Sequence, residues 1–207
     1  MQGLRLAALS LACILAWAPR AATGAERVIV ALGDSLTAGS GVLPDEAYPA
    51  RLEARLKREG YAYRVVTAGV SGDTTAGAVR RVEWVLRAAP EVAIVALGAN
   101  DGLRGQPTDR MRANLVEIVG RLRAGGVRVL LAGMRVPPNY GEAFTRAFAA
   151  VFPDVARQTR VPLMPFLLEG VATEPRLTQP DGIHPNADGH RVIADRLWPY
   201  LRPLLQE

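Results

Sequence analysis

The sequence has few cysteines, which cross-link small folds, and few histidines, which bind metals. Its 207 residues include one cysteine, Cys13, and two histidines, His184 and His190. A single cysteine closes no internal disulfide, so an apolar core must hold the fold together. Two histidines without cysteine partners do not supply the clustered ligands of a zinc site. These scarcities exclude a disulfide scaffold and a zinc domain, and no metal site is expected.

The sequence also lacks a segment in which charges of one sign cluster. The formal net charge is +5, but basic and acidic residues alternate, as they do over residues 51–59. Such mixing is typical of a solvated helix face and not of a nucleic-acid-binding stripe. About half of the residues are apolar, the balance of an ordinary globular protein. No nucleic-acid partner is therefore expected.

The N-terminal segment has its own pattern. Arg5 precedes an apolar run over residues 6–18, and Arg20 precedes small residues up to position 25. This order predicts a signal peptide over residues 1–25, cleaved near Ala25. A membrane anchor and a buried helix are the alternatives, but the run is shorter than the roughly 18 apolar residues that a membrane span needs. Lipid attachment at Cys13 is a weaker alternative, and no thiol remains after cleavage.

The rest of the chain alternates between short apolar runs and amphipathic stretches. The runs lack polar alternation, as strands covered by helices on both faces do. This alternation predicts an α/β sandwich with a parallel sheet, whose ligands bind beyond the carboxyl ends of the strands. The expected strands are residues 28–32, 63–68, 92–97, 127–132 and 161–164, and the expected helices are residues 48–58, 74–88, 109–124, 143–159 and 186–205.

A serine follows the first expected strand directly. The segment Gly33-Asp34-Ser35-Leu36-Thr37-Ala38-Gly39 places Ser35 on a sharp turn at the rim, with its hydroxyl exposed. A serine that caps a helix is the plain alternative. A phosphate loop is another, but the segment lacks the G-x-G-x-x-G and Gly-Lys-Ser/Thr patterns. It also differs from the G-x-S-x-G elbow, so the loop alone is only suggestive.

Two more loops offer hydrogen-bond donors at the same rim. In Ser71-Gly72-Asp73-Thr74, the backbone N–H of Gly72 can approach a ligand, and Asp73 or Thr74 is expected to cap the next helix. In Gly98-Ala99-Asn100-Asp101, the side-chain amide of Asn100 is a donor. Asparagine also occurs in such turns for its backbone tolerance alone. Neither loop is decisive by itself.

The candidate general base lies near the C-terminus, in Asp181-Gly182-Ile183-His184-Pro185-Asn186. Histidine is the usual base near neutral pH. His190 falls inside the last periodic helix, where a structural role, exposed or packed, is expected. Asp181, three residues before His184, can turn back to accept a hydrogen bond from the imidazole and orient it. The alternative is an Asp-capped turn with an incidental histidine, but four complementary rim loops argue against coincidence.

These four segments, in this order, resemble the four sequence blocks of the SGNH (GDSL-type) hydrolase family. The segment Gly133-Met134-Arg135-Val136-Pro137-Pro138-Asn139-Tyr140-Gly141 resembles the branch of multifunctional acyl-CoA thioesterase I, lysophospholipase L1 and arylesterase. Thr67 departs from the asparagine that many relatives have there. The resemblance implies a three-layer α/β/α sandwich with a flavodoxin-like five-stranded parallel sheet, and residues 26–207 as a single hydrolase domain.

The resemblance also implies the chemistry. Ser35 would be the nucleophile, His184 its general base, and Asp181 the residue that orients the base. The backbone N–H groups of Ser35 and Gly72 and the amide of Asn100 would form the oxyanion hole. No cofactor is needed for such a reaction. Aryl esters, acyl thioesters and lysophospholipids are the expected substrates, and the residues expected to contact them are Leu103, Pro138, Asn139 and Tyr140.

Two alternative functions stay open. A carbohydrate acetyl-esterase of the same family favours an aromatic-rimmed cleft, and an aromatic content of only 6% weighs against it. A flavodoxin-like binding module would leave Asn100 and the Asp181–His184 pair without a role. The preferred hypothesis is a monomeric ester hydrolase in the periplasm or outside the cell. It would act on a small ester or lipid-like substrate, without stable membrane insertion after signal cleavage.

Overall fold

The computed structural model describes residues 26–206. The signal-peptide prediction, with Cys13, falls on residues 1–25 and lies outside this part. In chain order the strands are β1 (Arg27–Gly33), β2 (Tyr63–Gly69), β3 (Val92–Ala96), β4 (Arg128–Ala132) and β5 (Leu163–Met164). The helices are α1 (Ser35–Ala38), α2 (Tyr48–Arg58), α3 (Thr75–Leu86), α4 (Ala99–Leu103), α5 (Thr108–Ala124), α6 (Glu142–Thr159) and α7 (Ala187–Leu201), with 3-10 turns η1 (Pro138–Tyr140) and η2 (Arg202–Leu204).

The strands form one sheet with the order β2-β1-β3-β4-β5, and every neighbouring pair is parallel. The predicted five-stranded parallel sheet is thereby confirmed. At the end of β1, Gly33 pairs with Gly69 of β2 and with Ala96 of β3. Since the three strands end level with one another, the loops that follow them emerge side by side.

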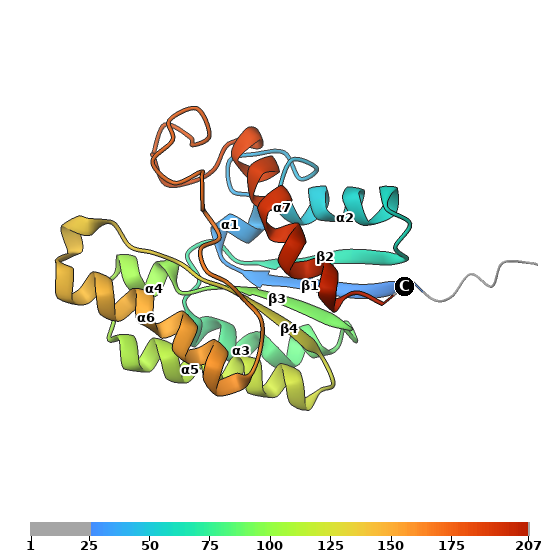
Figure 1. The fold of residues 1–207 in the computed structure, drawn as a ribbon, viewed down its shortest axis with the longest axis horizontal. Coiled ribbons are helices and arrows are strands. Elements are labelled where there is room, and N and C mark those ends of the chain that lie inside the picture. The colour runs from blue at the N-terminus through green and yellow to red at the C-terminus, as the bar shows by residue number, and fades with distance from the viewer. Residues whose placement is uncertain (1–25, 207) are drawn as a thin grey trace, which may run out of the picture.

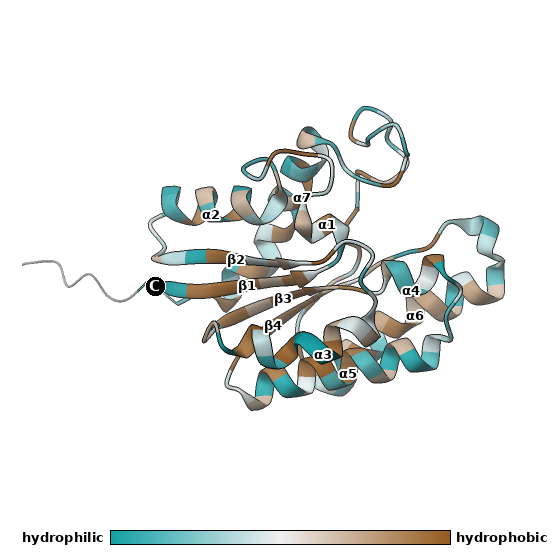
Figure 2. Ribbon diagram, turned by 180° about the vertical axis from the view of Figure 1, so that it is seen from behind, coloured by the Kyte–Doolittle hydropathy of each residue, from teal (hydrophilic) through white to brown (hydrophobic). Residues whose placement is uncertain are grey.

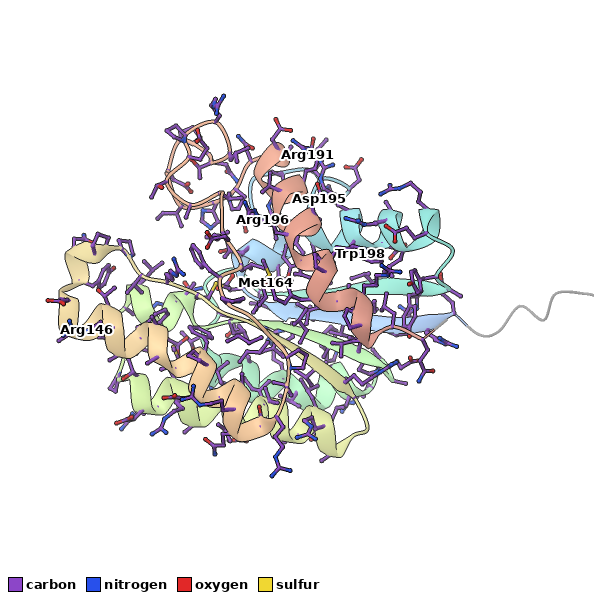
Figure 3. The ribbon with its side chains drawn as sticks, in the orientation of Figure 1. Arg146, Met164, Arg191, Asp195, Arg196 and Trp198 are labelled. Carbon is purple, nitrogen blue, oxygen red and sulfur yellow. The ribbon has the colours of Figure 1, made fainter. Side chains whose placement is uncertain are left out.

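Helices cover both faces of the sheet, as the apolar strands require. In Figure 1, α2 and α7 lie on one face, and α3, α5 and α6 lie on the other. Figure 2 shows mainly brown ribbon along β1, β3 and β4, between helices that alternate teal and brown as amphipathic helices do. Trp198, labelled in Figure 3, joins α7 to α2, because the guanidinium carbon of Arg55 lies 4.6 Å from its ring centroid. The three-layer sandwich is therefore confirmed.

The structure differs from the sequence expectation at the sheet edge and at the rim. β5 has two residues where four were expected, because Pro162 and Pro165 flank it and proline donates no ladder hydrogen bond. The short helices α1 and α4 were not predicted, and both lie at the rim directly after strands. Within residues 26–206, no helix combines the length and apolar character needed to cross a membrane.

Candidate active site

The turn from β1 into α1 presents Ser35 at the rim. Ser35 is the first residue of α1, and Asp34 caps that helix through Oδ1, which accepts from Leu36 N. The turn is tight enough to require glycine on both strands below it. A Cβ at Gly33 would lie 1.9 Å from Thr37 Oγ1, and one at Gly69 would lie 2.2 Å from Ala38 N. These two glycines allow α1 to lie directly across the strand ends.

Ser35, His184 and Asp181 lie together, although 146 or more residues separate the serine from the other two in sequence. His184 Nε2 is 2.9 Å from Ser35 Oγ, and His184 Nδ1 is 2.6 Å from Asp181 Oδ2. This chain of contacts has the geometry of a nucleophile, a base and a carboxylate that orients the base.

The other oxygen of Asp181 fixes the turn that carries the histidine. Asp181 Oδ1 accepts from the backbone N–H groups of Ile183 at 2.9 Å and His184 at 3.0 Å. These bonds stabilise the ionised carboxylate. The hydrogen bond to His184, followed by the backbone bonds, lowers the pKa of Asp181 to about 2. The group is therefore a carboxylate at neutral pH, able to stabilise a protonated imidazole.

The two other loops bring Gly72 and Asn100 to the same cleft as Ser35 and His184. Gly72 has φ +76°, a left-handed conformation that favours glycine. Asn100 lies in the first turn of α4 and donates from Nδ2 to Asp34 Oδ2 at 3.2 Å. This bond uses one of its two amide N–H groups and holds the side chain beside the serine turn.

Asp34 is thus a second carboxyl group beside the nucleophile, and its role was not predicted. It is 1% exposed, and burial raises its pKa to about 6 against the lowering effect of its bonds to Leu36 and Asn100. The one feature of the sequence that pointed to Asp34 was its position directly before Ser35, in the first of the four segments that resemble the family. Asp34 joins the serine turn to the Asn100 loop, because its two oxygens bond one loop each.

Arg81, on α3, joins the serine turn to the Gly72 loop. Its guanidinium donates to the carbonyl oxygens of Gly33 at 3.3 Å and Ala68 at 3.0 Å. It also donates twice to Asp73 Oδ2, at 2.6 and 3.0 Å. One side chain therefore connects the ends of β1 and β2 to the residue after Gly72. Nothing in the amphipathic pattern of the helix distinguished this arginine beforehand.

A buried network connects the Gly72 and Asn100 loops. Asp101 is 1% exposed and accepts from Thr75 N at 2.9 Å and Thr75 Oγ1 at 2.6 Å. Asn114 on α5 donates to Thr75 Oγ1 at 3.0 Å. Of the two residues expected to cap α3, Asp73 and Thr74, it is Thr74 whose side chain accepts from Gly77 N. The beginnings of α3 and α4 are therefore fixed relative to each other.

The cleft above these residues has a volume of about 760 Å³ and mainly apolar walls. Of the four residues expected to contact substrate, Leu103 and Pro138 line this cleft, whereas Asn139 and Tyr140 are not among its lining residues. The Tyr140 hydroxyl instead donates to the Leu103 carbonyl oxygen at 2.9 Å and so supports this wall from behind. The remaining apolar lining comes from Leu36, Ala99, Val136, Pro137, Phe166, Leu168, Ala172 and Ile183.

His190 is buried on α7, so of the exposed and packed structural roles that its place in the periodic helix left open, the packed one holds. It is 1% exposed, and its Nδ1 accepts from Tyr48 N at 3.3 Å. Burial lowers its pKa to about 4, so the ring is neutral at pH 7. Within residues 26–206, no group of three or more histidine, cysteine, aspartate or glutamate side chains is placed to hold a metal ion.

The fold and the arrangement of these residues match one family of hydrolases. The model of the GDSL-like Lipase/Acylhydrolase family matches residues 31–192, and the chain belongs to this family. The match includes Ser35, Gly72, Asn100, Asp181 and His184. The resemblance that the four sequence blocks indicated is therefore confirmed at the level of the family.

Individual relatives agree with this assignment. The chain is 41% identical over 182 residues to "Esterase TesA" of Pseudomonas aeruginosa, covering 87% of this chain and 90% of that protein. It is 37% identical over 185 residues to "Thioesterase 1/protease 1/lysophospholipase L1" of Escherichia coli, covering 89% and 87%. The crystal structure of TesA superposes with a TM-score of 0.84 at 40% identity, covering 86% of this chain and 100% of that one.

Proposed function

We propose that this protein is a serine hydrolase that cleaves carboxylic esters and acyl thioesters through an acyl-enzyme. The observation that carries the proposal is the contact chain from Ser35 Oγ to His184 Nε2 (2.9 Å) and from His184 Nδ1 to Asp181 Oδ2 (2.6 Å), at the floor of an apolar cleft. The named activities of the relatives, an esterase and a thioesterase/lysophospholipase, support the same class.

In the first half of the reaction, His184 Nε2 accepts the Ser35 proton while Oγ bonds to the acyl carbon. Asp181 keeps the imidazole in the required tautomer and stabilises its protonated form. The carbonyl oxygen becomes an oxyanion, which the N–H groups of Ser35 and Gly72 and the free amide N–H of Asn100 stabilise. Protonated His184 then gives its proton to the leaving alcohol or thiol, and the C–O or C–S bond breaks.

In the second half, His184 accepts a proton from water, whose oxygen attacks the acyl-serine. The same donors stabilise the second oxyanion, and His184 returns the proton to Ser35 Oγ as the carboxylic acid leaves. Asp34 and Arg81 act as positioning residues in this scheme. Asp34 holds Asn100 against the serine turn, and Arg81 holds the Gly72 loop there.

The walls of the cleft favour an aliphatic or aryl acyl group. Leu36, Leu103, Pro138 and Ile183 are apolar, and Phe166 is the one phenylalanine, tyrosine or tryptophan among the lining residues of this described cleft. Sugar-binding clefts rely on aromatic faces, so the lining supports the lipid-like and aryl esters over acetylated carbohydrate. We further propose that residues 26–207 act as a monomeric single domain, exported by the signal peptide at residues 1–25.

The test is hydrolysis of p-nitrophenyl esters from acetate to palmitate by residues 26–207, with Ser35→Ala as the control. Serine-dependent activity that rises from acetate to medium-length acyl chains is expected. Activity confined to acetate, together with release of acetate from acetylated xylan, would favour the carbohydrate esterase. Full activity of Ser35→Ala would overturn the proposed nucleophile. N-terminal sequencing of the protein recovered outside the cytoplasm tests export, and an N-terminus near Glu26 is expected.

A further inference from the structure

Two opposite charges on the cleft wall have no part in the hydrolytic mechanism. Arg135 follows β4, Glu169 follows β5, and both line the cleft that contains Ser35 and His184. Both are exposed. Asp34, the other carboxyl group of this cleft, is buried and bonded to Asn100. Arg135 and Glu169 are therefore the charges that an incoming substrate meets on this wall.

An aromatic ring orients Arg135. The guanidinium carbon lies over the ring of Phe166, 4.9 Å from its centroid, within the range of a cation–π contact. In the part of the chain that the structure describes, no carboxylate lies within ion-pair distance of it. An arginine held over an aromatic ring loses less conformational freedom on binding, and its planar set of N–H donors matches the oxygens of a phosphate. Arg135 is thus a pre-oriented group for a phosphate.

Glu169 belongs to the same corner of the cleft. Its backbone N–H donates to the Phe166 carbonyl oxygen at 3.3 Å, so the turn that supplies the ring also supplies the carboxylate. Glu169 also lines a second cleft of about 500 Å³ with Arg196 and Met164, both labelled in Figure 3. Among the described residues, no ion pair joins Glu169 to either arginine. The carboxylate therefore stays available to a cation.

Arg135 and Glu169 carry opposite charges and form no ion pair with each other, so together they complement a ligand that carries both a negative and a positive charge. Glu169 repels a purely anionic ligand and Arg135 a purely cationic one, so the corner selects for a zwitterion. Val136, Pro138 and Leu168, in the same cleft, offer apolar surface for one acyl chain. Resting on the proposed esterase function, we infer that Arg135 and Glu169 form a headgroup subsite for zwitterionic single-chain phospholipids. Arg135 binds the phosphate, and Glu169 binds the ammonium group.

The experiment compares three decanoyl substrates below their critical micelle concentrations: lysophosphatidylcholine, lysophosphatidylglycerol and monodecanoylglycerol. The first is zwitterionic, the second is anionic and the third is uncharged, and all present the same ester of glycerol. Arg135→Gln is expected to lower kcat/KM by about tenfold to a hundredfold for the two phosphate substrates, and to leave it within twofold for monodecanoylglycerol. Glu169→Gln is expected to lower kcat/KM for the choline substrate several-fold and to raise it for lysophosphatidylglycerol.

Arg58→Gln, which removes the same charge from the exposed end of α2, is the matched control and is expected to change none of the three. An equal loss on all three substrates in Arg135→Gln would overturn the subsite, as would no change on any of them. Hydrolysis of p-nitrophenyl decanoate separates this outcome from failure of the proposed function. If the wild type cleaves that ester but prefers monodecanoylglycerol to lysophosphatidylcholine, the subsite alone is refuted. If it cleaves no ester, the esterase proposal itself fails.

Discussion

The side-chain amide of Asn100 has two N–H groups, and one of them donates a hydrogen bond within the protein. Nδ2 donates to Asp34 Oδ2 at 3.2 Å, which leaves the other N–H for the cleft. Asn100→Ala removes one of three proposed oxyanion donors. Losing one such donor typically costs about 100- to 1,000-fold in kcat, or about 2.7–4 kcal/mol. KM should change only a few-fold, because the contact strengthens as the oxyanion forms.

The same substitution also acts on Asp34, which is buried. Without the amide, the Asp34 carboxylate keeps the Leu36 N–H at 3.0 Å but loses a side-chain donor that lowers its pKa. The pKa of Asp34, about 6 in the intact protein, should therefore rise further. The free energy of unfolding at pH 7.5 should fall by about 1–2 kcal/mol. This loss is too small to unfold an ordinary domain, so the kinetic effect is measurable on folded protein.

The assay is steady-state hydrolysis of p-nitrophenyl butyrate at pH 7.5, with urea denaturation of the same preparations. Asn139→Ala is the matched control, because it removes an amide from a residue that does not line the cleft. Its kcat should stay within twofold, and any substrate contact by Asn139 would appear in KM. A kcat for Asn100→Ala within threefold of wild type, or a change confined to KM, would refute the oxyanion role.

Three further perturbations test the positioning and the stability of the site. Asp181→Asn keeps the side-chain size but removes the charge, so kcat should fall by about 10,000-fold, and an unchanged kcat would contradict the orienting role. Arg81→Gln removes the hydrogen bonds from the guanidinium to Asp73 and to the Gly33 carbonyl oxygen, so kcat should fall about tenfold with little change in KM. Arg81→Lys should restore part of the lost kcat. An effect on KM alone would refute the positioning role of Arg81. The pKa of His190 is about 4 in the folded protein, against an ordinary value of 6.5. Between these two pH values the unfolded chain binds more protons than the folded one. The free energy of unfolding must therefore fall as the pH drops from 6.5 to 4, by up to about 3 kcal/mol. Asp34, whose folded pKa is raised, changes the free energy of unfolding in the opposite direction between about pH 4 and 6. Because wild type and His190→Asn share this contribution, the measurement is the difference between their unfolding free energies, taken at pH 7.5 and at pH 4.5. A difference that does not change with pH would contradict the burial argument.

Strands that are buried on both faces could be located from sequence because they must be apolar throughout. The expected runs at residues 28–32 and 92–97 correspond to β1 and β3, whose residues are almost all buried. The edge strand β5 was less predictable, because proline residues shorten it and the chain leaves the sheet after Met164. Rim helices of four or five residues are too short for an amphipathic period to mark them.

The candidate site was predictable where motif residues follow strands. Ser35, Gly72 and Asn100 are adjacent in space because β1, β2 and β3 end level and bring their loops to one edge, and the loop before α7 adds His184 to the same cleft. The residues that connect those loops were not predictable. Arg81 reaches the Gly33 carbonyl oxygen from 48 residues away, and Asn114 reaches Thr75 from 39 residues away. Such bonds depend on how helices pack over the sheet, and no local spacing encodes them.

The proposed mechanism depends above all on Ser35 being a nucleophile that His184 activates. The most direct measurement is labelling of the protein with a fluorophosphonate, followed by intact mass and peptide mapping, for wild type, Ser35→Ala and His184→Ala. One adduct at Ser35 is expected, absent in Ser35→Ala and formed far more slowly in His184→Ala. An adduct on another cleft serine, Ser40 or Ser71, or no adduct on folded wild-type protein, would contradict the account.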